Sequence, residues 1–140
     1  MKIAICGSMV FARQMKKTRK FLEERGCQVI TPVFVDDWAS GTLVKRLSED
    51  KRKKDHDLIR DYYQKIKSAE AVLILNYTKK RIKNYIGGNS FLEMGFAHVL
   101  GKKIYLLNPI PKLDLYRDEI KAMEPVILNG DLAKIKLMKN

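Results

Sequence analysis

The segment Tyr85–Asn108, YIGGNSFLEMGFAHVLGKKIYLLN, contains the clearest transition from a helix to a strand in the chain. Its apolar residues recur at helical spacing over Phe91–Leu100, which predicts a helix with one buried face. Gly101 is a natural stop for that helix. The apolar run Ile104–Leu107 follows almost at once and predicts a buried strand. A helix that leads directly into a buried strand is typical of an α/β fold.

Glu93 is the one acid in this segment. If Asn89 or Ser90 caps the helix, Glu93 is expected in the first turn, where the helix dipole favours its ionised form. The free backbone N–H groups around Gly88–Phe91 would then face an anion such as a phosphate or a carboxylate. A second interpretation stays open, because Ser90 and Glu93 also fit the capping-box pattern S-x-x-E, which has a structural role only.

The composition predicts one globular domain that spans residues 1–140, because 46% of the 140 residues are apolar. No apolar run approaches the length of a membrane span, and the start MKIAICGS is not typical of a signal peptide, so a cytoplasmic location is expected. Cys6 and Cys27 do not have the spacing of a metal site. Because His-x-x-x-His and Cys-x-x-Cys are also missing, we expect no bound metal and no cofactor.

The net charge of +12 permits attraction to nucleic acid, to acidic membranes or to small phosphorylated ligands. The basic residues are spread along the chain, without the interleaved aromatic residues that stack on bases. We therefore expect lysines dispersed on the surface rather than a nucleic-acid interface. The overall positive field would still help a nucleotide to reach a pocket.

The first quarter of the chain has the pattern of a βαβ unit, with a strand at Lys2–Cys6, a helix at Phe11–Arg25 and a strand at Gln28–Thr31. Ligands of open parallel sheets bind beyond the carboxyl ends of the strands. That rule places three residues on the ligand side: Gly7, Ser8 and Met9. The dinucleotide signature G-x-G-x-x-G is not present.

The rest of the chain continues this alternation. The expected elements are an irregular, possible lid connection at Val33–Thr42, helical structure within Leu43–Ser68, a strand at Ala71–Leu75, a helix at Tyr116–Met123, a strand at Val126–Leu128 and a terminal helix ending near Met138. This order predicts a doubly wound α/β fold, Rossmann-like or flavodoxin-like, with a mainly parallel five-stranded sheet and helices on both faces. Asp57 and Asp61 would share one helical face, where pairing with nearby bases is the simplest role.

Three pieces of the sequence together resemble the nucleoside 2-deoxyribosyltransferase superfamily, nearest to the 2′-deoxynucleoside 5′-phosphate N-hydrolases. The first is Cys6-Gly7-Ser8-Met9, with Arg13 shortly downstream. The second is Asp61 followed by Ala69-Glu70-Ala71-Val72, and the third is the run GNSFLEMGFA at Gly88–Ala97. The resemblance extends over most of the chain, from Lys2 to about Met123.

The resemblance implies an enzyme that cleaves the N-glycosidic bond of 2′-deoxynucleosides or of their 5′-monophosphates. The sugar would pass either to water or to a second base. By resemblance Glu93 is the nucleophile, and Asp61 is the acid, with Asp57 in reserve. The resemblance implies these substrate-binding residues: Gly7, Ser8, Arg13, Gly88, Asn89 and Ser90 toward the sugar and phosphate, and Met9, Phe11 and Met94 beside the base.

The sequence departs from the family in two places. Val10 and Phe11 stand where the family hydrolases carry an arginine after the turn, and Asn76 stands where some transferases carry an acid. Family members complete each site with residues from a neighbouring subunit, which implies a homodimer or a higher homo-oligomer. By position, Glu119–Met123 is the segment expected to reach the neighbouring site.

Two further function classes stay open at this point. A non-catalytic module that binds or senses nucleotides could use the same fold. The phosphoribohydrolases also place glycines before a glutamate, in the signature P-G-G-x-G-T-x-x-E, but here Ile86 stands in place of the proline. We therefore rank that family lower.

Overall fold

The sheet is the centre of the structure, a computed structural model that describes residues 1–40 and 57–135. Its five strands are β1 (Lys2–Cys6), β2 (Gln28–Ile30), β3 (Ala71–Ile74), β4 (Lys103–Leu106) and β5 (Val126–Ile127). They lie in the order β2-β1-β3-β4-β5, and every neighbouring pair is parallel. This is the flavodoxin-like order, whose switch point lies between β1 and β3. The predicted fold class is confirmed.

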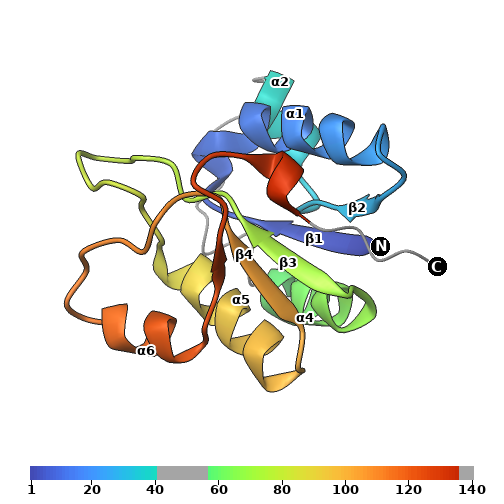
Figure 1. The fold of residues 1–140 in the computed structure, drawn as a ribbon. Coiled ribbons are helices and arrows are strands. Elements are labelled where there is room, and N and C mark those ends of the chain that lie inside the picture. Colours follow the sequence, from blue (N-terminus) through green and yellow to red (C-terminus); the bar gives the residue numbers. More distant parts are fainter. Residues whose placement is uncertain (41–56, 136–140) are drawn as a thin grey trace.

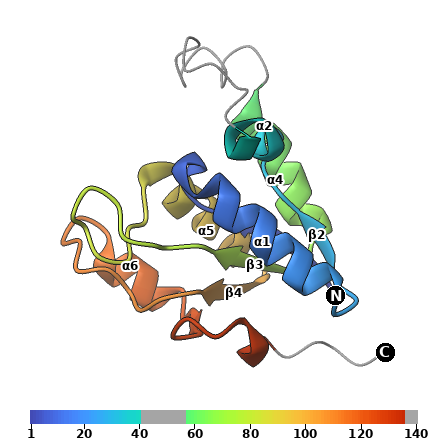
Figure 2. The same cartoon turned by 90° about the horizontal axis from the view of Figure 1, so that it is seen from above.

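Helices cover both faces of the sheet (Figures 1 and 2). One face carries a short 3₁₀ turn η1 (Met9–Phe11), α1 (Ala12–Glu23), α2 (Val35–Ser40) and a second 3₁₀ turn η2 (Leu132–Lys134); the other carries α4 (Leu58–Ser68), α5 (Gly88–Val99) and α6 (Arg117–Ala122). None of the helices in the described part of the chain is long and apolar enough to cross a membrane.

The alternation of side chains along β3 explains why two cores form. All four residues of β3 are buried. Ala71 and Leu73 pack in the core under α1, whereas Val72 and Ile74 pack in the core under α4 and α5. A strand buried on both faces reads as a continuous apolar run, and this is the pattern from which the strand was predicted.

The segment after β2 is helical, and the prediction of an irregular connection at Val33–Thr42 is wrong for Val35–Ser40. Asp36 and Asp37 lie in the first turn of α2, where the helix dipole favours acids. Val35 and Ala39, four residues apart, are buried against the α1 face of the sheet. The helix is short, so its signal was limited to one apolar pair.

Other boundaries differ by a few residues. Of the predicted helical stretch Leu43–Ser68, residues 43–56 lie outside the described residues, and α4 begins after the N-cap Asp57. The terminal helix predicted near Met138 is a 3₁₀ turn at Leu132–Lys134 within the described residues, and residues 136–138 lie outside them. Gly101, at φ 70°, follows the C-cap of α5 as predicted.

Polar contacts fasten α2 to α1. The guanidinium of Arg19 donates to Asp36 Oδ1 at 2.7 Å and to Thr31 Oγ1 at 3.1 Å. The hydrogen bond from Arg19 holds the pKa of the Asp36 carboxyl below its ordinary value, and the charges of Arg19 and Lys16 add to this effect. Arg13 Nε donates to the backbone oxygen of Ala39 at 3.2 Å. Basic side chains of α1 therefore hold α2 in addition to the burial of Val35 and Ala39.

Asn76 joins the ends of β3 and β4. Its Nδ2 donates to Asn108 O at 2.8 Å, and its Oδ1 accepts from the Asn108 backbone N–H at 2.9 Å. The side chain is fully buried. A carboxylate could accept at this position but could not donate to the Asn108 carbonyl, so the amide is what this contact requires.

Gly7, directly after β1, is predicted to be intolerant of a side chain. A Cβ there would lie 3.2 Å from Met15 Cε and 3.3 Å from the backbone oxygen of Leu75. We expect Gly7→Ala to lower the free energy of unfolding by about 1–3 kcal/mol, measured by urea denaturation. Gly95→Ala on α5 is the matched control, because nothing lies within 4 Å of its Cβ. Equal stability of the two variants would contradict this prediction.

Candidate active site

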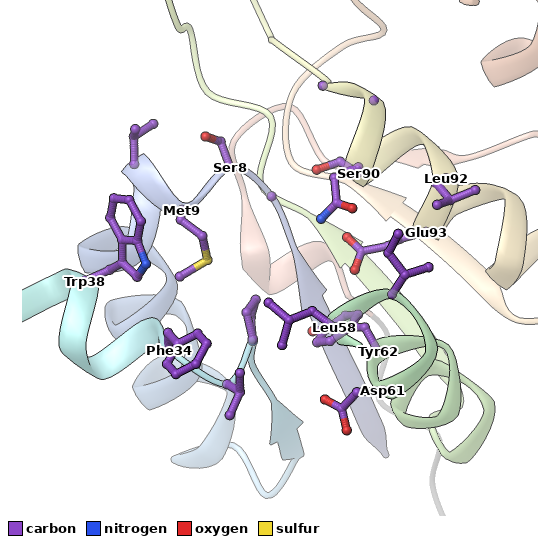
Figure 3. Close-up of a pocket in the computed structure, with 18 of the residues that line it drawn as sticks. Ser8, Met9, Phe34, Trp38, Leu58, Asp61, Tyr62, Ser90, Leu92 and Glu93 are labelled. Atoms are coloured by element: carbon purple, nitrogen blue, oxygen red, sulfur yellow. The ribbon is translucent and has the colours of Figure 1, made fainter. Parts of the chain in front are cut away.

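A cavity of about 370 Å³ opens at the carboxyl ends of β1 and β3, at the switch point of the sheet. The turn after β1, the segment from β2 into α2, the start of α4, the β3–α5 loop and the first turns of α5 form its walls. Figure 3 shows side chains converging on it from these elements. This is where the parallel-sheet rule predicted a ligand.

The structure brings most of the predicted site residues together. Those that line the cavity are Gly7, Ser8, Met9, Asp61, Gly88, Asn89, Ser90 and Glu93. They come from three separate segments of the chain, so only the fold makes them neighbours.

Four predicted residues do not line the cavity: Phe11, Arg13, Asp57 and Met94. Phe11 is buried edge-on against Tyr77, and Met94 is fully buried in the core under the sheet. Arg13 donates to Ala39 of α2, as described above. Asp57 caps α4 and pairs with Arg60 at 2.8 Å. Each of these side chains has a structural contact instead.

The start of α5 lies earlier than the sequence indicated. Gly87 is the N-cap and Gly88 the first helical residue, with no side-chain hydrogen bond to the cap. Ser90 is therefore inside the helix, and Glu93 lies in the second turn rather than the first. The capping-box interpretation of Ser90 and Glu93 is wrong, and so is the expected position of Glu93 in the first turn.

Glu93 is a nearly buried carboxyl group, 7% exposed, on the wall of the cavity. Cys6, at the end of β1, and Tyr62, on α4, lie next to it. Burial raises the pKa of the Cys6 thiol well above its ordinary value, and the charge of Glu93 and a side-chain hydrogen bond with it raise this pKa further. The thiol is therefore protonated at neutral pH and is a donor to Glu93.

Tyr62 is the second neutral group beside Glu93. Burial raises the pKa of its phenol well above the ordinary value, and the charges of Cys6, Glu93 and Asp61 act in the same direction. Its hydroxyl donates to the backbone oxygen of Ile5. The tyrosine therefore stays protonated and fixes α4 to β1, and it forms part of the floor of the cavity.

Asp61 lies at the rim of the cavity. Its side chain is 46% exposed and pairs with Lys65 at 3.0 Å, one helical turn away. The pairing expected for a solvated acid on a helix is present, and Asp61 also lines the cavity. In Figure 3 its carboxylate lies below Tyr62.

An apolar wall faces Glu93 across the cavity. Figure 3 shows Trp38, Phe34 and Met9 together on the side opposite α5. Leu58 of α4 lies between these side chains and Tyr62. A flat aromatic ring is the kind of group that such a wall accommodates.

Sequence analysis missed part of this site. Trp38 and Phe34 were not chosen because α2 was expected to be an irregular connection. Lys79 was not chosen either, although its Nζ donates to Ser8 Oγ at 2.9 Å inside the cavity. Its position a few residues beyond the end of a buried strand was the available signal. Within residues 1–40 and 57–135, no group of three or more His, Cys, Asp or Glu side chains could hold a metal ion.

Comparisons with known proteins found similarity at the level of structure. No family model and no curated protein matches the chain. The CMP N-glycosidase BcmB of Clostridium botulinum is 21% identical, with 76% of this chain and 70% of that chain covered and a TM-score of 0.43. A 2-deoxyribosyltransferase from Bacillus psychrosaccharolyticus is 18% identical, with 76% and 71% covered and a TM-score of 0.46.

The fold is defined by the sheet itself, which is open and all-parallel with helices on both faces. The function is therefore argued below from the residues of the cavity.

Both thiols are predicted to be unreactive in the folded protein. Cys6 and Cys27 are free, 0% and 6% exposed, and burial raises the pKa of each. We expect a thiol-specific disulfide reagent at neutral pH to react at least about a hundredfold more slowly with native than with denatured protein. Rapid reaction of one thiol in the native protein would show that Cys6 or Cys27 is accessible and would contradict the placement described here.

Proposed function

We propose that this protein cleaves the N-glycosidic bond of 2′-deoxynucleosides or of their 5′-monophosphates, with Glu93 as the nucleophile. The observation that carries the proposal is a nearly buried carboxyl group that faces an aromatic wall in a cavity at the switch point of the sheet. The wall accommodates a flat base, and the carboxylate is suited to the electron-poor carbon of a sugar.

In the first step, Glu93 attacks C1′ of the sugar. The bond between C1′ and the base nitrogen breaks, and its electron pair leaves with the base. The departing base takes up a proton, and Asp61, at the rim of the cavity, is the residue to which we assign its delivery. The product of this step is a sugar ester of Glu93 and a free base.

In the second step, water attacks C1′ of the ester. Asp61 takes the proton from the water, and the carboxylate of Glu93 leaves with the electron pair of the ester bond. Both acids return to their starting forms. A second base in place of water gives deoxyribosyl transfer, by the same two displacements at C1′.

The groups beside Glu93 support this role. Cys6 and Tyr62 stay protonated, so they add no negative charge around the nucleophile. Positive charge develops at C1′ in the transition state, and a carboxylate in a poorly solvated cavity interacts with it strongly. The hydrogen bond with the Cys6 thiol fixes the orientation of the carboxylate.

A second candidate is a module that binds nucleotides without cleaving them. The ion pair between Asp61 and Lys65 favours it, because an exposed and paired carboxylate is a poor proton donor. Binding of nucleotides without release of a base from any of them would select this candidate.

Replacement of Glu93 is the direct test of the reaction. We expect Glu93→Gln to lower the rate of base release by at least about a thousandfold, because the amide is not a nucleophile of comparable strength. Chromatography of free base, after incubation with each deoxynucleoside and each 5′-monophosphate, measures the rate. The matched control is Glu24→Gln, an exposed acid at the end of α1, which is expected to keep the wild-type rate. Base release at the wild-type rate by Glu93→Gln would refute this mechanism.

Trp38 provides an independent measure of binding, because it is the one tryptophan of the chain and lines the cavity. A base stacked on the indole is expected to quench its fluorescence. Titration with a slowly cleaved nucleotide, on the Glu93→Gln protein, measures the dissociation constant. Trp38→Leu, followed by calorimetry, is expected to weaken binding by about tenfold, and unchanged affinity would show that the base lies elsewhere.

A further inference from the structure

Lys79 is the only positively charged side chain that lines the cavity among the residues described. Its Nζ donates to Ser8 Oγ at 2.9 Å and lies 5.0 Å from the centre of the Tyr85 ring. No carboxylate within residues 1–40 and 57–135 forms an ion pair with it. A half-buried ammonium group with neutral partners leaves its charge available to a ligand.

A strained hairpin holds Lys79 at this place. Lys79 and Ile82 exchange two backbone hydrogen bonds, of 3.1 and 2.9 Å, around a turn of two residues. These residues, Lys80 and Arg81, have φ angles of 50° and 65°. Such a turn favours asparagine and glycine, because a left-handed conformation is costly for residues with longer side chains. The hairpin fixes the backbone of Lys79 on both sides.

The start of α5 supplies further donors in the same cavity. The N–H groups of Gly88, Asn89 and Ser90 precede the first hydrogen bond of the helix, from Phe91 to Gly87, and no side chain caps them. Ser90 is 4% exposed, and its hydroxyl has no hydrogen-bond partner among the described residues. Figure 3 shows Ser90 on the cavity side of α5. Among the described residues no buried side-chain oxygen lacks a partner, so the Ser90 hydroxyl is accessible from the cavity and can bond a ligand oxygen there.

We propose that Lys79 makes this site selective for nucleoside 5′-monophosphates over nucleosides. The inference rests on the proposed function and assigns its substrate class. A phosphate monoester carries close to two negative charges and three acceptor oxygens at neutral pH. Lys79, Ser8, Ser90 and the N–H groups of α5 provide the cation and the donors that such a group requires.

The spacing along α5 fits a nucleotide. Ser90 and Glu93 are three residues apart and share one face of the helix, with about 5–6 Å between the Cβ atoms of such a pair. This is the order of separation between the 5′-phosphate and C1′ across a furanose ring. A phosphate at the start of α5 therefore leaves C1′ near Glu93.

Lys79 supplies a positive charge that the family hydrolases obtain from an arginine in the turn after β1. The turn after β1 carries Val10 and Phe11 instead of a base, and Arg13 donates to Ala39. The positive charge comes from the loop after β3 instead. The basic loop between Asn76 and Gly87 has a defined role in this arrangement.

The test is calorimetry of the Glu93→Gln protein with matched pairs, each common 2′-deoxynucleoside and its 5′-monophosphate. We expect the monophosphates to bind at least about tenfold more tightly than the nucleosides. Lys79→Met is expected to remove this preference, whereas Lys79→Arg keeps most of it. Inorganic phosphate is expected to compete with the monophosphates for the protein that has Lys79, but not for the Lys79→Met protein.

The matched control is Lys80→Asn with Arg81→Gly. It removes two neighbouring charges and gives the hairpin the residues that its turn favours. It is expected to keep the preference for monophosphates. Loss of the preference in this control, but not in Lys79→Met, would assign the effect to the general charge of the loop and overturn the inference. Equal affinity of the Glu93→Gln protein, with Lys79 unchanged, for a nucleoside and its 5′-monophosphate would also overturn the inference.

The outcomes separate this inference from the proposed function. Base release that requires Glu93 but is equally fast on nucleosides and monophosphates would refute the role of Lys79 alone. Monophosphate binding that requires Lys79, without base release from any substrate, would support the role of Lys79 and refute the proposed reaction.

Discussion

The parallel pairing of β1 with β3 is the constraint on which the rest of the structure depends. Cys6 pairs with Ile74 at the carboxyl end of this ladder, and the chain leaves the two strands toward opposite faces of the sheet. α1 covers one face and α5 the other, so the connections diverge, and the cavity lies above the strands between them. Every polar group of the candidate site is placed around that crevice by an element that begins there or ends there.

The burial of Glu93 sets the chemical character of the site. A carboxylate removed from water loses several kcal/mol of solvation unless donors replace the water. Here a protonated thiol is beside it, and the neighbouring phenol is engaged with the backbone of β1. A purely structural glutamate would be expected at the surface or in a helix cap, and this one is in neither place. The fold thus keeps the Glu93 carboxylate in contact with a cavity although its removal from water is unfavourable.

The sequence was sufficient to predict the order of the elements, the parallel sheet and the part of the site that follows β1 and begins α5. The periodic apolar residues and the turns at Gly7 and Gly101 carried this information. It was insufficient where short-range signals compete with tertiary packing. Asn89 and Ser90 have strong capping propensity, but the helix starts at Gly88, with Gly87 as its N-cap and without a side-chain cap. Three other predicted residues have side chains suited to a ligand but make structural contacts instead. Arg13 contacts α2, Phe11 contacts Tyr77, and Met94 packs in the core. These contacts join segments that are distant in the sequence.

The attachment of α2 has a consequence for how this molecule could diversify. The aromatic wall of the cavity is carried by a six-residue helix and the segment before it, outside the sheet, and basic side chains of α1 hold that helix through polar contacts. Glu93, in contrast, belongs to the helix packed against β3 and β4. Exchange of α2 between related chains would alter the aromatic face of the cavity while Glu93 and the sheet stay as they are. If the proposed reaction holds, recognition of the base and the chemistry are encoded in separate elements, and base preference can change without a change in the reacting groups.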